Sequence, residues 1–204
     1  MKVKICGITN IGDALFAERS GADAIGVVIS EESPRCISTE DAKEIFSVLG
    51  PFTATVIVTH TKSQDLIDEM AAVNPSAIQV STDVKRPENY CGKMIRVAGS
   101  DGKVTGDCDA IIIDQSHGRG VPFDYEYAEK ILRTAVKPVI LAGGLDPSNV
   151  AAAISRLQPL DLYAVDVCSG VEKSPGIKDP MMILEFLKAA GKIPAVRKKG
   201  KISL

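Results

Sequence analysis

Residues 138–167 read PVILAGGLDPSNVAAAISRLQPLDLYAVDV, and this stretch contains the pattern that decides the fold. An apolar run, Pro138–Leu141, is followed by a glycine turn, by a segment with helical periodicity over Pro147–Leu157, and by a second apolar run, Tyr163–Val167. Short apolar runs bounded by turn residues are typical of buried strands. The order strand, helix, strand implies that the two strands pair in parallel through a right-handed crossover.

The same unit recurs along the whole chain. Apolar runs predict eight strands: Val3–Cys6, Ala24–Val28, Ala54–Val58, Ala77–Gln79, Met94–Val97, Ala110–Ile113, Pro138–Leu141 and Tyr163–Val167. Helical periodicity predicts helices over Ile11–Ser20, Thr39–Leu49, Ser63–Val73, Val84–Cys91, Tyr125–Ala135, Pro147–Leu157 and Pro180–Ala190. Three of these helices begin next to candidate N-cap residues, namely Ser38, Thr61 or Ser63, and Asp146.

One crossover lacks a helix in this prediction. Between the fifth and sixth strands the sequence GSDGKVTGDC (99–108) has too many glycines and too few residues for one, so we expect a loop. Eight alternating units in 204 residues predict a single α/β domain over 1–204, a small (β/α)8 barrel. An open doubly wound sheet is the competing architecture, but the first turn has no G-x-G-x-x-G sequence and the chain has no P-loop.

Composition narrows the class of protein. A formal net charge of -2 gives no reason to expect nucleic acid or an anionic membrane as partner, and residues 193–204, although basic, are expected to be a solvated tail. No run of 18 apolar residues and no secretory leader is present, which favours a cytoplasmic protein. The five cysteines are scattered and the histidines number two, so we expect free thiols and no metal site.

Polar residues occur at the ends of four predicted strands: Cys6, Gln79, Asp114 and Asp166. In a (β/α)8 barrel the active site lies at the carboxyl ends of the strands. Any single one of these residues could be a hydrogen-bonded core residue, but four at one rim favour an active site.

Strand alternation places Lys4 and Cys6 on the same side of the first strand. If that side is the barrel interior, the ammonium lies below the thiol, favours its ionised form and makes Cys6 a usable base or nucleophile. Alternatively Lys4 pairs with an interior carboxylate such as Asp166, and both arrangements can hold together.

Glycine turns follow the seventh and eighth strands, at Gly143-Gly144 and Ser169-Gly170-Val171. These glycines could simply be turn residues. In this fold, however, the same two loops commonly bind a phosphate through their backbone amides.

Two further loops belong to the same rim. Arg35, in the second loop, is either a solvated surface residue or a bidentate partner for a carboxylate. The segment QSHGRGVPFDY (115–125) follows Asp114 and suits a mobile cover over the site.

Five motifs resemble the phosphoribosylanthranilate isomerase family over nearly the whole chain. They are KICGIT (4–9), GADAIGVV (21–28), SPRCIS (33–38), LAGGLDPSNV (141–150) and AVDVCSGVE with PGIKD (164–172 and 175–179). The resemblance implies an aldose-ketose isomerase of tryptophan biosynthesis. Its reaction is an Amadori rearrangement that converts N-(5-phosphoribosyl)anthranilate into 1-(2-carboxyphenylamino)-1-deoxyribulose 5-phosphate without metal or organic cofactor.

The resemblance also assigns roles by position. It makes Cys6 the base, Asp114 the acid and Arg35 the contact to the anthranilate carboxylate, with phosphate at the two glycine turns; Gln79 and Asp166 are further substrate-binding candidates. An aspartate that is an acid near neutral pH needs surroundings that favour its protonated form, whereas Cys6 needs the opposite.

The chain departs from the family pattern in places. The fourth strand continues as QVSTD (79–83) instead of QLHG, Cys36 stands where an aromatic residue is frequent, and loop 115–125 keeps only its glycines and FDY. Alternative functions are a histidine-pathway-like or dual-substrate sugar-phosphate isomerase and a non-catalytic phosphate-binding barrel. A homo-oligomer is compatible with the sequence.

Overall fold

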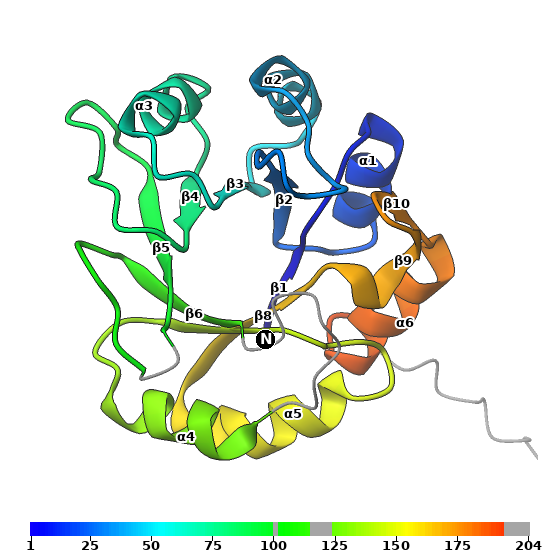
Figure 1. Ribbon diagram of the computed structural model, residues 1–204. Coiled ribbons are helices and arrows are strands. Elements are labelled where there is room, and N and C mark those ends of the chain that lie inside the picture. The colour runs from blue at the N-terminus through cyan, green and yellow to red at the C-terminus, as the bar shows by residue number, and fades with distance from the viewer. Residues whose placement is uncertain (100–101, 115–123, 194–204) are drawn as a thin grey trace, which may run out of the picture.

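The computed structural model describes residues 1–99, 102–114 and 124–193, and in these ranges eight parallel strands close into a barrel in chain order. β1 pairs with both β2 and β8, which closes the sheet and confirms the predicted (β/α)8 barrel (Figure 1). The strands are β1 (Lys2–Ile5), β2 (Ala24–Val28), β3 (Ala54–Thr59), β4 (Ala77–Val80), β5 (Lys93–Val97), β6 (Ala110–Asp114), β7 (Val139–Ala142) and β8 (Leu162–Val167).

Helices cover the outside of most of the barrel. They are α1 (Ile11–Arg19), α2 (Thr39–Ser47), α3 (Gln64–Ala72), α4 (Tyr125–Thr134), α5 (Val150–Leu157) and α6 (Pro180–Ala189). Two 3₁₀ turns, η1 (Gln158–Leu160) and η2 (Ser169–Val171), and a small hairpin of β9 (Glu172–Ser174) and β10 (Ile177–Lys178) complete the chain order. Figure 1 shows loops, and no labelled helix, beside β5.

The described part of the β5–β6 crossover is a loop, as the sequence predicted, but the helix predicted over Val84–Cys91 was wrong. Side chains from other elements bind part of the backbone of this segment. Arg96, buried on β5, donates to the carbonyl oxygens of Thr82 and Val84 and also to that of Asp107 in the next loop. Arg96 therefore joins the two loops that replace helices.

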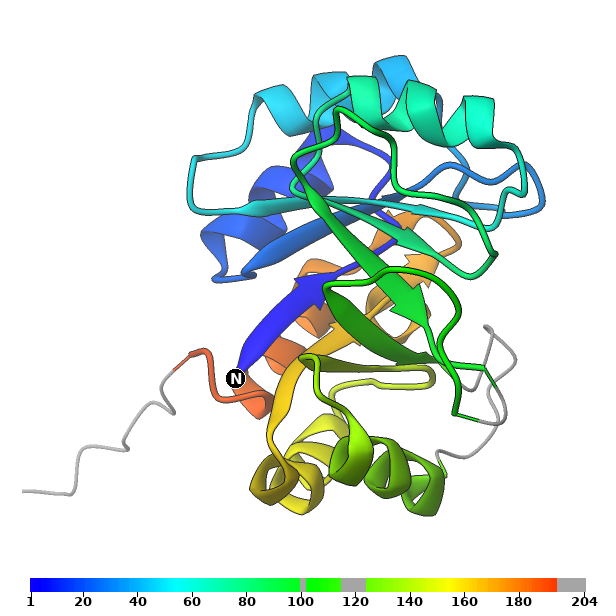
Figure 2. The same cartoon turned by 90° about the vertical axis from the view of Figure 1, so that its left-hand side faces the viewer.

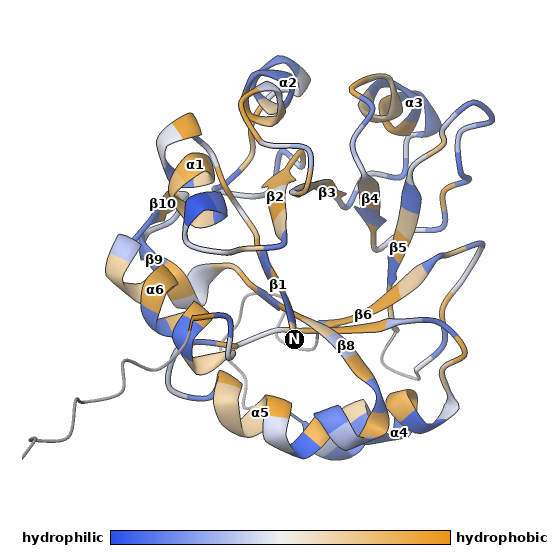
Figure 3. Cartoon of the chain, turned by 180° about the vertical axis from the view of Figure 1, so that it is seen from behind, coloured by the Kyte–Doolittle hydropathy of each residue, from blue (hydrophilic) through white to orange (hydrophobic). Residues whose placement is uncertain are grey.

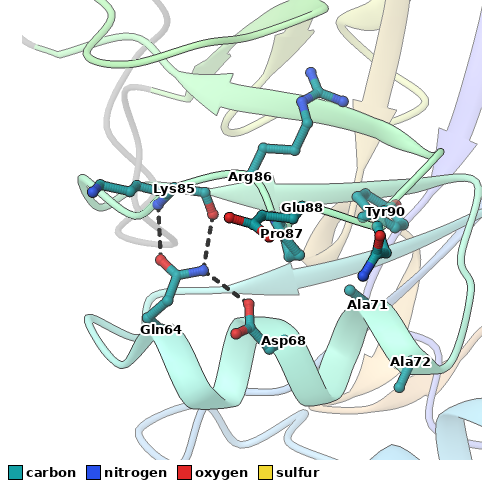
Figure 4. Close-up of a pocket in the computed structure, with 10 residues that line it drawn as sticks. Gln64, Asp68, Ala71, Ala72, Lys85, Arg86, Pro87, Glu88 and Tyr90 are labelled. Carbon is teal, nitrogen blue, oxygen red and sulfur yellow. Dashed lines mark hydrogen bonds between the residues drawn. The ribbon is translucent and has the colours of Figure 1, made fainter.

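The same segment is also held by α3. The Gln64 side chain accepts from the Lys85 backbone N–H at 2.9 Å and donates to its carbonyl at 3.1 Å, as Figure 4 shows. A hollow of about 580 Å³ lies between α3 and residues 85–90. It is lined by none of the predicted site residues.

Strand alternation divides the core into two clusters. Outward-facing residues such as Ile25, Ile57 and Val165 pack against the helices, while inward residues such as Val56, Ile95 and Ile140 fill the barrel. Figure 3 shows hydrophobic residues along the strands, with more hydrophilic colour on β1 than on β2. Of the two lysines on β1, Lys4 is buried among apolar residues and Lys2 is exposed.

Helix starts were predicted well where a side chain caps the helix. Ser38 forms a capping box with Asp41, and the Ser63 side chain accepts from the N–H of Leu66. The prediction that Asp146 is the N-cap of α5 was wrong. Its carboxylate accepts from the N–H groups of Ser148 and Asn149 in a preceding turn. α5 therefore begins at Val150.

Figure 2 shows β1 running from the end of the barrel marked N to the opposite end, where the carboxyl ends of the parallel strands gather. Most of the predicted mobile cover (115–123) and most of the basic tail (194–204) lie outside the described residues. Within the described ranges no helix is long and apolar enough to cross a membrane.

Candidate active site

A cavity of about 350 Å³ opens at the carboxyl ends of the strands and collects nearly all of the predicted site residues. Its walls include Cys6, Arg35, Gln79, Asp114, Gly143, Gly144, Asp166 and Ser169. Gly170 and Val171 are not among the lining residues. The position of the cavity is the one that the fold assigns to an active site.

Cys6 follows the last residue of β1 and is buried against β8. Its backbone N–H donates to the Val167 carbonyl at 2.8 Å, which continues the β1–β8 ladder by one residue and directs the thiol toward the cavity. The adjacent Cys168 thiol holds the pKa of Cys6 well below its ordinary value, against the effect of burial, and the nearby Lys4 acts in the same direction. Cys6 is thus set in surroundings that favour a thiolate.

Lys4 lies inside the barrel below Cys6, as strand alternation predicted. Its Nζ is 3.0 Å from Asp166 Oδ1 and 3.2 Å from Gln79 Oε1, and all three residues are buried. Burial works against the charged ammonium, yet Asp166 and Cys6 together hold the pKa of Lys4 above its ordinary value. Burial raises the pKa of Asp166 to about 7, although Lys4 acts in the opposite direction. Both sequence alternatives for Lys4 therefore hold at once.

Asp114 is the last residue of β6 and reaches the cavity from the far side of the barrel mouth. When ionised, its carboxylate adds to the rise in the pKa of the nearby Asp166. His60 and Ser81 also line the cavity, with His60 Nδ1 2.7 Å from Ser81 Oγ. Among the described residues no group of three or more His, Cys, Asp or Glu side chains is placed to hold a metal ion.

Arg35 makes the bidentate carboxylate pair that its residue type suggested, but with a residue of this chain. Its Nε and Nη2 donate to the two carboxylate oxygens of Glu172 at 2.8 and 2.7 Å. Glu172 also accepts from Lys178 at 2.8 Å. The pair fixes the guanidinium at the cavity wall and leaves Nη1 outside the two bonds to Glu172.

The two glycine turns pack tightly together. Gly143 and Gly144 have φ of +86° and +68°, which favour glycine. A Cβ on Gly170 would lie 1.9 Å from the Leu145 carbonyl oxygen, so this residue brings the two turns into contact. Val171 packs into the outer core.

Sequence reasoning missed three residues of the site: Cys168, Glu172 and Lys178. Cys168 was counted only as one of the scattered cysteines, and all five are free thiols as expected. Glu172 and Lys178 lie in the motif after β8 and are joined by an antiparallel pairing of β9 and β10. The spacing of the motif gave no signal for this pairing.

Comparison with known proteins identifies the family of the chain. The family model for N-(5'-phosphoribosyl)anthranilate isomerase matches residues 3–189. A relative of that name from Methanoregula boonei is 50% identical over 192 residues, covering 93% of this chain and 96% of its own.

Two solved structures have similar folds. One is phosphoribosylanthranilate isomerase in complex with reduced 1-(o-carboxyphenylamino)-1-deoxyribulose 5-phosphate, with a TM-score of 0.75 and 33% identity over 95% of this chain and 100% of the other. The other consists of monomers generated from the dimeric enzyme of Thermotoga maritima, with a TM-score of 0.75 and 32% identity over 95% of this chain and 100% of that one. The chain therefore belongs to the N-(5'-phosphoribosyl)anthranilate isomerase family, aldose-ketose isomerases of tryptophan biosynthesis.

Proposed function

We propose that Cys6 is the base and Asp114 the acid of the rearrangement of N-(5-phosphoribosyl)anthranilate. Asp114 protonates the furanose ring oxygen as the ring opens to a Schiff base, and Cys6 removes the proton at C2 of that intermediate. The observation that carries the proposal is that the two residues reach the same cavity from different sides of the barrel mouth. This placement allows each to act on a different atom of one substrate.

The surroundings of Cys6 support its role. Proton abstraction needs the thiolate, and Lys4 and Cys168 both favour that form. Lys4, Asp166 and Gln79 are joined by hydrogen bonds directly beneath Cys6, inside the barrel. Gln79 and Asp166 also line the cavity, where we assign them contacts to the ribose hydroxyls.

The substrate's two anionic ends suggest how it lies in the cavity. We place the phosphate at the turns of Gly143-Gly144 and Ser169-Gly170-Val171, where glycine lets an anion approach the backbone amides. We place the anthranilate carboxylate at Arg35, whose position is already set by Glu172.

Turnover of freshly made phosphoribosylanthranilate, followed by the loss of anthranilate fluorescence, tests the assignment. Cys6→Ala and Asp114→Ala should each lower kcat by about 10²–10⁴-fold while product affinity is kept. Near wild-type turnover by Cys6→Ala would remove the proposed base. A wild-type protein that binds product without turnover would be a non-catalytic barrel, and turnover of the histidine-pathway substrate would establish a dual-substrate enzyme.

Arg35 is tested separately because it also holds Glu172. Arg35→Met should raise KM by at least about tenfold, since the charged contact to the substrate carboxylate is lost. Arg35→Lys keeps the charge without the planar fork and should lie between wild type and Arg35→Met. An unchanged KM in both variants would limit Arg35 to its structural pair.

We also propose that this cytoplasmic enzyme forms a homodimer. The relative from Thermotoga maritima is described as dimeric, and here Phe52 is 99% exposed beside a hollow of about 570 Å³ at the amino-terminal end of the barrel. Light scattering should give about twice the 21.6 kDa chain mass for wild type and the single-chain mass for Phe52→Asp. The same mass for both proteins would refute the proposal that Phe52 lies in the dimer interface.

The five free thiols support the cytoplasmic location, because thiols stay reduced in that compartment.

A further inference from the structure

A second thiol lies directly beside Cys6. Cys168 comes immediately after β8, and Cys6 immediately after β1, which pairs with β8 in a register that sets Ile5 opposite Val167. The two cysteines are therefore the next residues of two paired strands, and both line the cavity. The packing here is close, because a Cβ on Gly7 would lie 2.6 Å from Cys168 Sγ. The two sulfur atoms therefore share one small site.

Lys178 contacts Cys168 from outside the cavity. Its side chain is fully buried, and its Nζ lies 3.0 Å from the Cys168 carbonyl oxygen and 4.0 Å from Cys168 Sγ. Lys178 does not line the cavity, so it acts on the thiols electrostatically, from within the protein, without touching a ligand in the cavity. A buried ammonium in this position favours negative charge on the thiols.

The charges around the pair indicate how many protons it holds. Groups that act on or face the thiols are Lys4 and Asp166 from the barrel interior, Arg35, Glu172 and Lys178 from the side, and Asp114 and His60 from across the cavity. The interior and side groups comprise three cations and two carboxylates. With Asp166 and Glu172 ionised, these interior and side charges are balanced when one of the two thiols is a thiolate and the other keeps its proton.

We infer that Cys168 is a positioning residue for the reaction: it keeps its proton and donates an S–H hydrogen bond to the Cys6 thiolate, while Lys178 behind it supplies a second cation. The inference rests on the proposed role of Cys6. Consistent with it, the same contact lowers the pKa of Cys6 and raises that of Cys168. Cys168 acts on the base and not on the substrate, so its loss should change kcat and its pH dependence more than KM.

The test compares Cys168→Ala, which removes the donor, with Cys168→Ser, which keeps a hydroxyl donor. Each protein is treated with iodoacetamide across a pH series, and alkylation is read by mass spectrometry on the tryptic peptide of residues 5–19, which contains Cys6 and no other cysteine. Cys91→Ala removes an exposed cysteine elsewhere and is the matched control.

Cys168→Ala should move the midpoint of Cys6 alkylation upward by about one to two pH units, the value of a hydrogen bond to a charged group. The acid limb of kcat should move with it, KM should stay within about twofold, and Cys168→Ser should return the midpoint toward wild type. Lys178→Gln should move the midpoint in the same direction by removing the cation.

An unchanged midpoint in both Cys168→Ala and Lys178→Gln would overturn the inference. So would a midpoint in Cys168→Ser that matches Cys168→Ala, because packing alone would then explain the effect. Alkylation does not depend on turnover. A shifted midpoint together with an active Cys6→Ala enzyme would therefore reject the catalytic role of Cys6 and leave the thiol pair intact.

Discussion

Replacing Lys4 with methionine removes the cation beneath Cys6, and the structure sets the size of the effect. A point at the Cβ position of Gly26 lies 3.0 Å from Cys6 Sγ and 3.2 Å from Lys4 Nζ. Sγ and Nζ are therefore at most about 6 Å apart, where opposite unit charges attract by about 3 kcal/mol at an effective dielectric constant of ~20. This energy corresponds to about two pH units in the ionisation of Cys6.

The direction of the expected pH shift follows from the positive charge of Lys4. A cation favours the thiolate, so Lys4→Met should move the acid limb of the kcat profile about two pH units upward and restore much of the turnover at alkaline pH. Asp166 loses its partner as well, but burial already raises its pKa to about 7, so it can take up a proton instead of leaving a buried charge.

Steady-state turnover from pH 5.5 to 9.5, roughly the range over which a thiol with a perturbed pKa titrates, would locate the limb in each protein. Lys2→Met is the matched control, because it removes the same charge from the same strand at an exposed position paired with Asp23. A limb that stays in place in Lys4→Met, or that moves equally in Lys2→Met, would refute the electrostatic argument. Loss of turnover at every pH would place Lys4 in another role.

Three further substitutions test the packing of the site and the barrel. Glu172→Gln should lower the free energy of unfolding at pH 7 by about 3–5 kcal/mol, because the buried Lys178 and the partly buried Arg35 lose their anion. Despite burial, hydrogen bonds hold the pKa of Glu172 below its ordinary value of 4.5. The difference from wild type in urea unfolding should therefore shrink as the pH falls below that value, and a pH-independent difference would contradict the pairing. Arg96→Met should lower the free energy of unfolding by about 3–5 kcal/mol, since three backbone carbonyls lose a charged donor, and a loss below about 1 kcal/mol in thermal denaturation would count against this role. Gly7→Ala should reduce both stability and kcat, because the new Cβ would meet Cys168 Sγ at 2.6 Å at a φ of +70°. Gly21→Ala shares the positive φ in open space, so equal effects in both variants would show that the close contact is unimportant.

The sequence by itself determined the order of the strands and the rim on which the site lies. Alternation on β1 places Lys4 and Cys6 on one face, and parallel pairing brings the ends of β1, β4, β6 and β8 to one end of the barrel. These conclusions depend only on residues close together in the sequence and on the geometry of parallel strands, so the amino-acid sequence alone is enough to reach them.

Only the tertiary structure decided which side chains become partners. Residues 84–91 have helical periodicity, yet they form a loop, and Arg96 from the next strand binds the carbonyl oxygens of Thr82 and Val84 where that helix would begin. Arg35 is in the loop after β2, and its carboxylate partner Glu172 is in the hairpin after β8.

The pairing of Cys6 with Cys168 has the same origin. Their contact exists because the barrel closes β8 against β1, which no local pattern encodes. Periodicity reports which face of an element is buried, but hydrogen bonds and ion pairs between distant loops depend on where closure puts them. For this protein the sequence therefore placed Cys6, the proposed base, at the cavity, and the fold supplied the thiol and the buried lysine beside it.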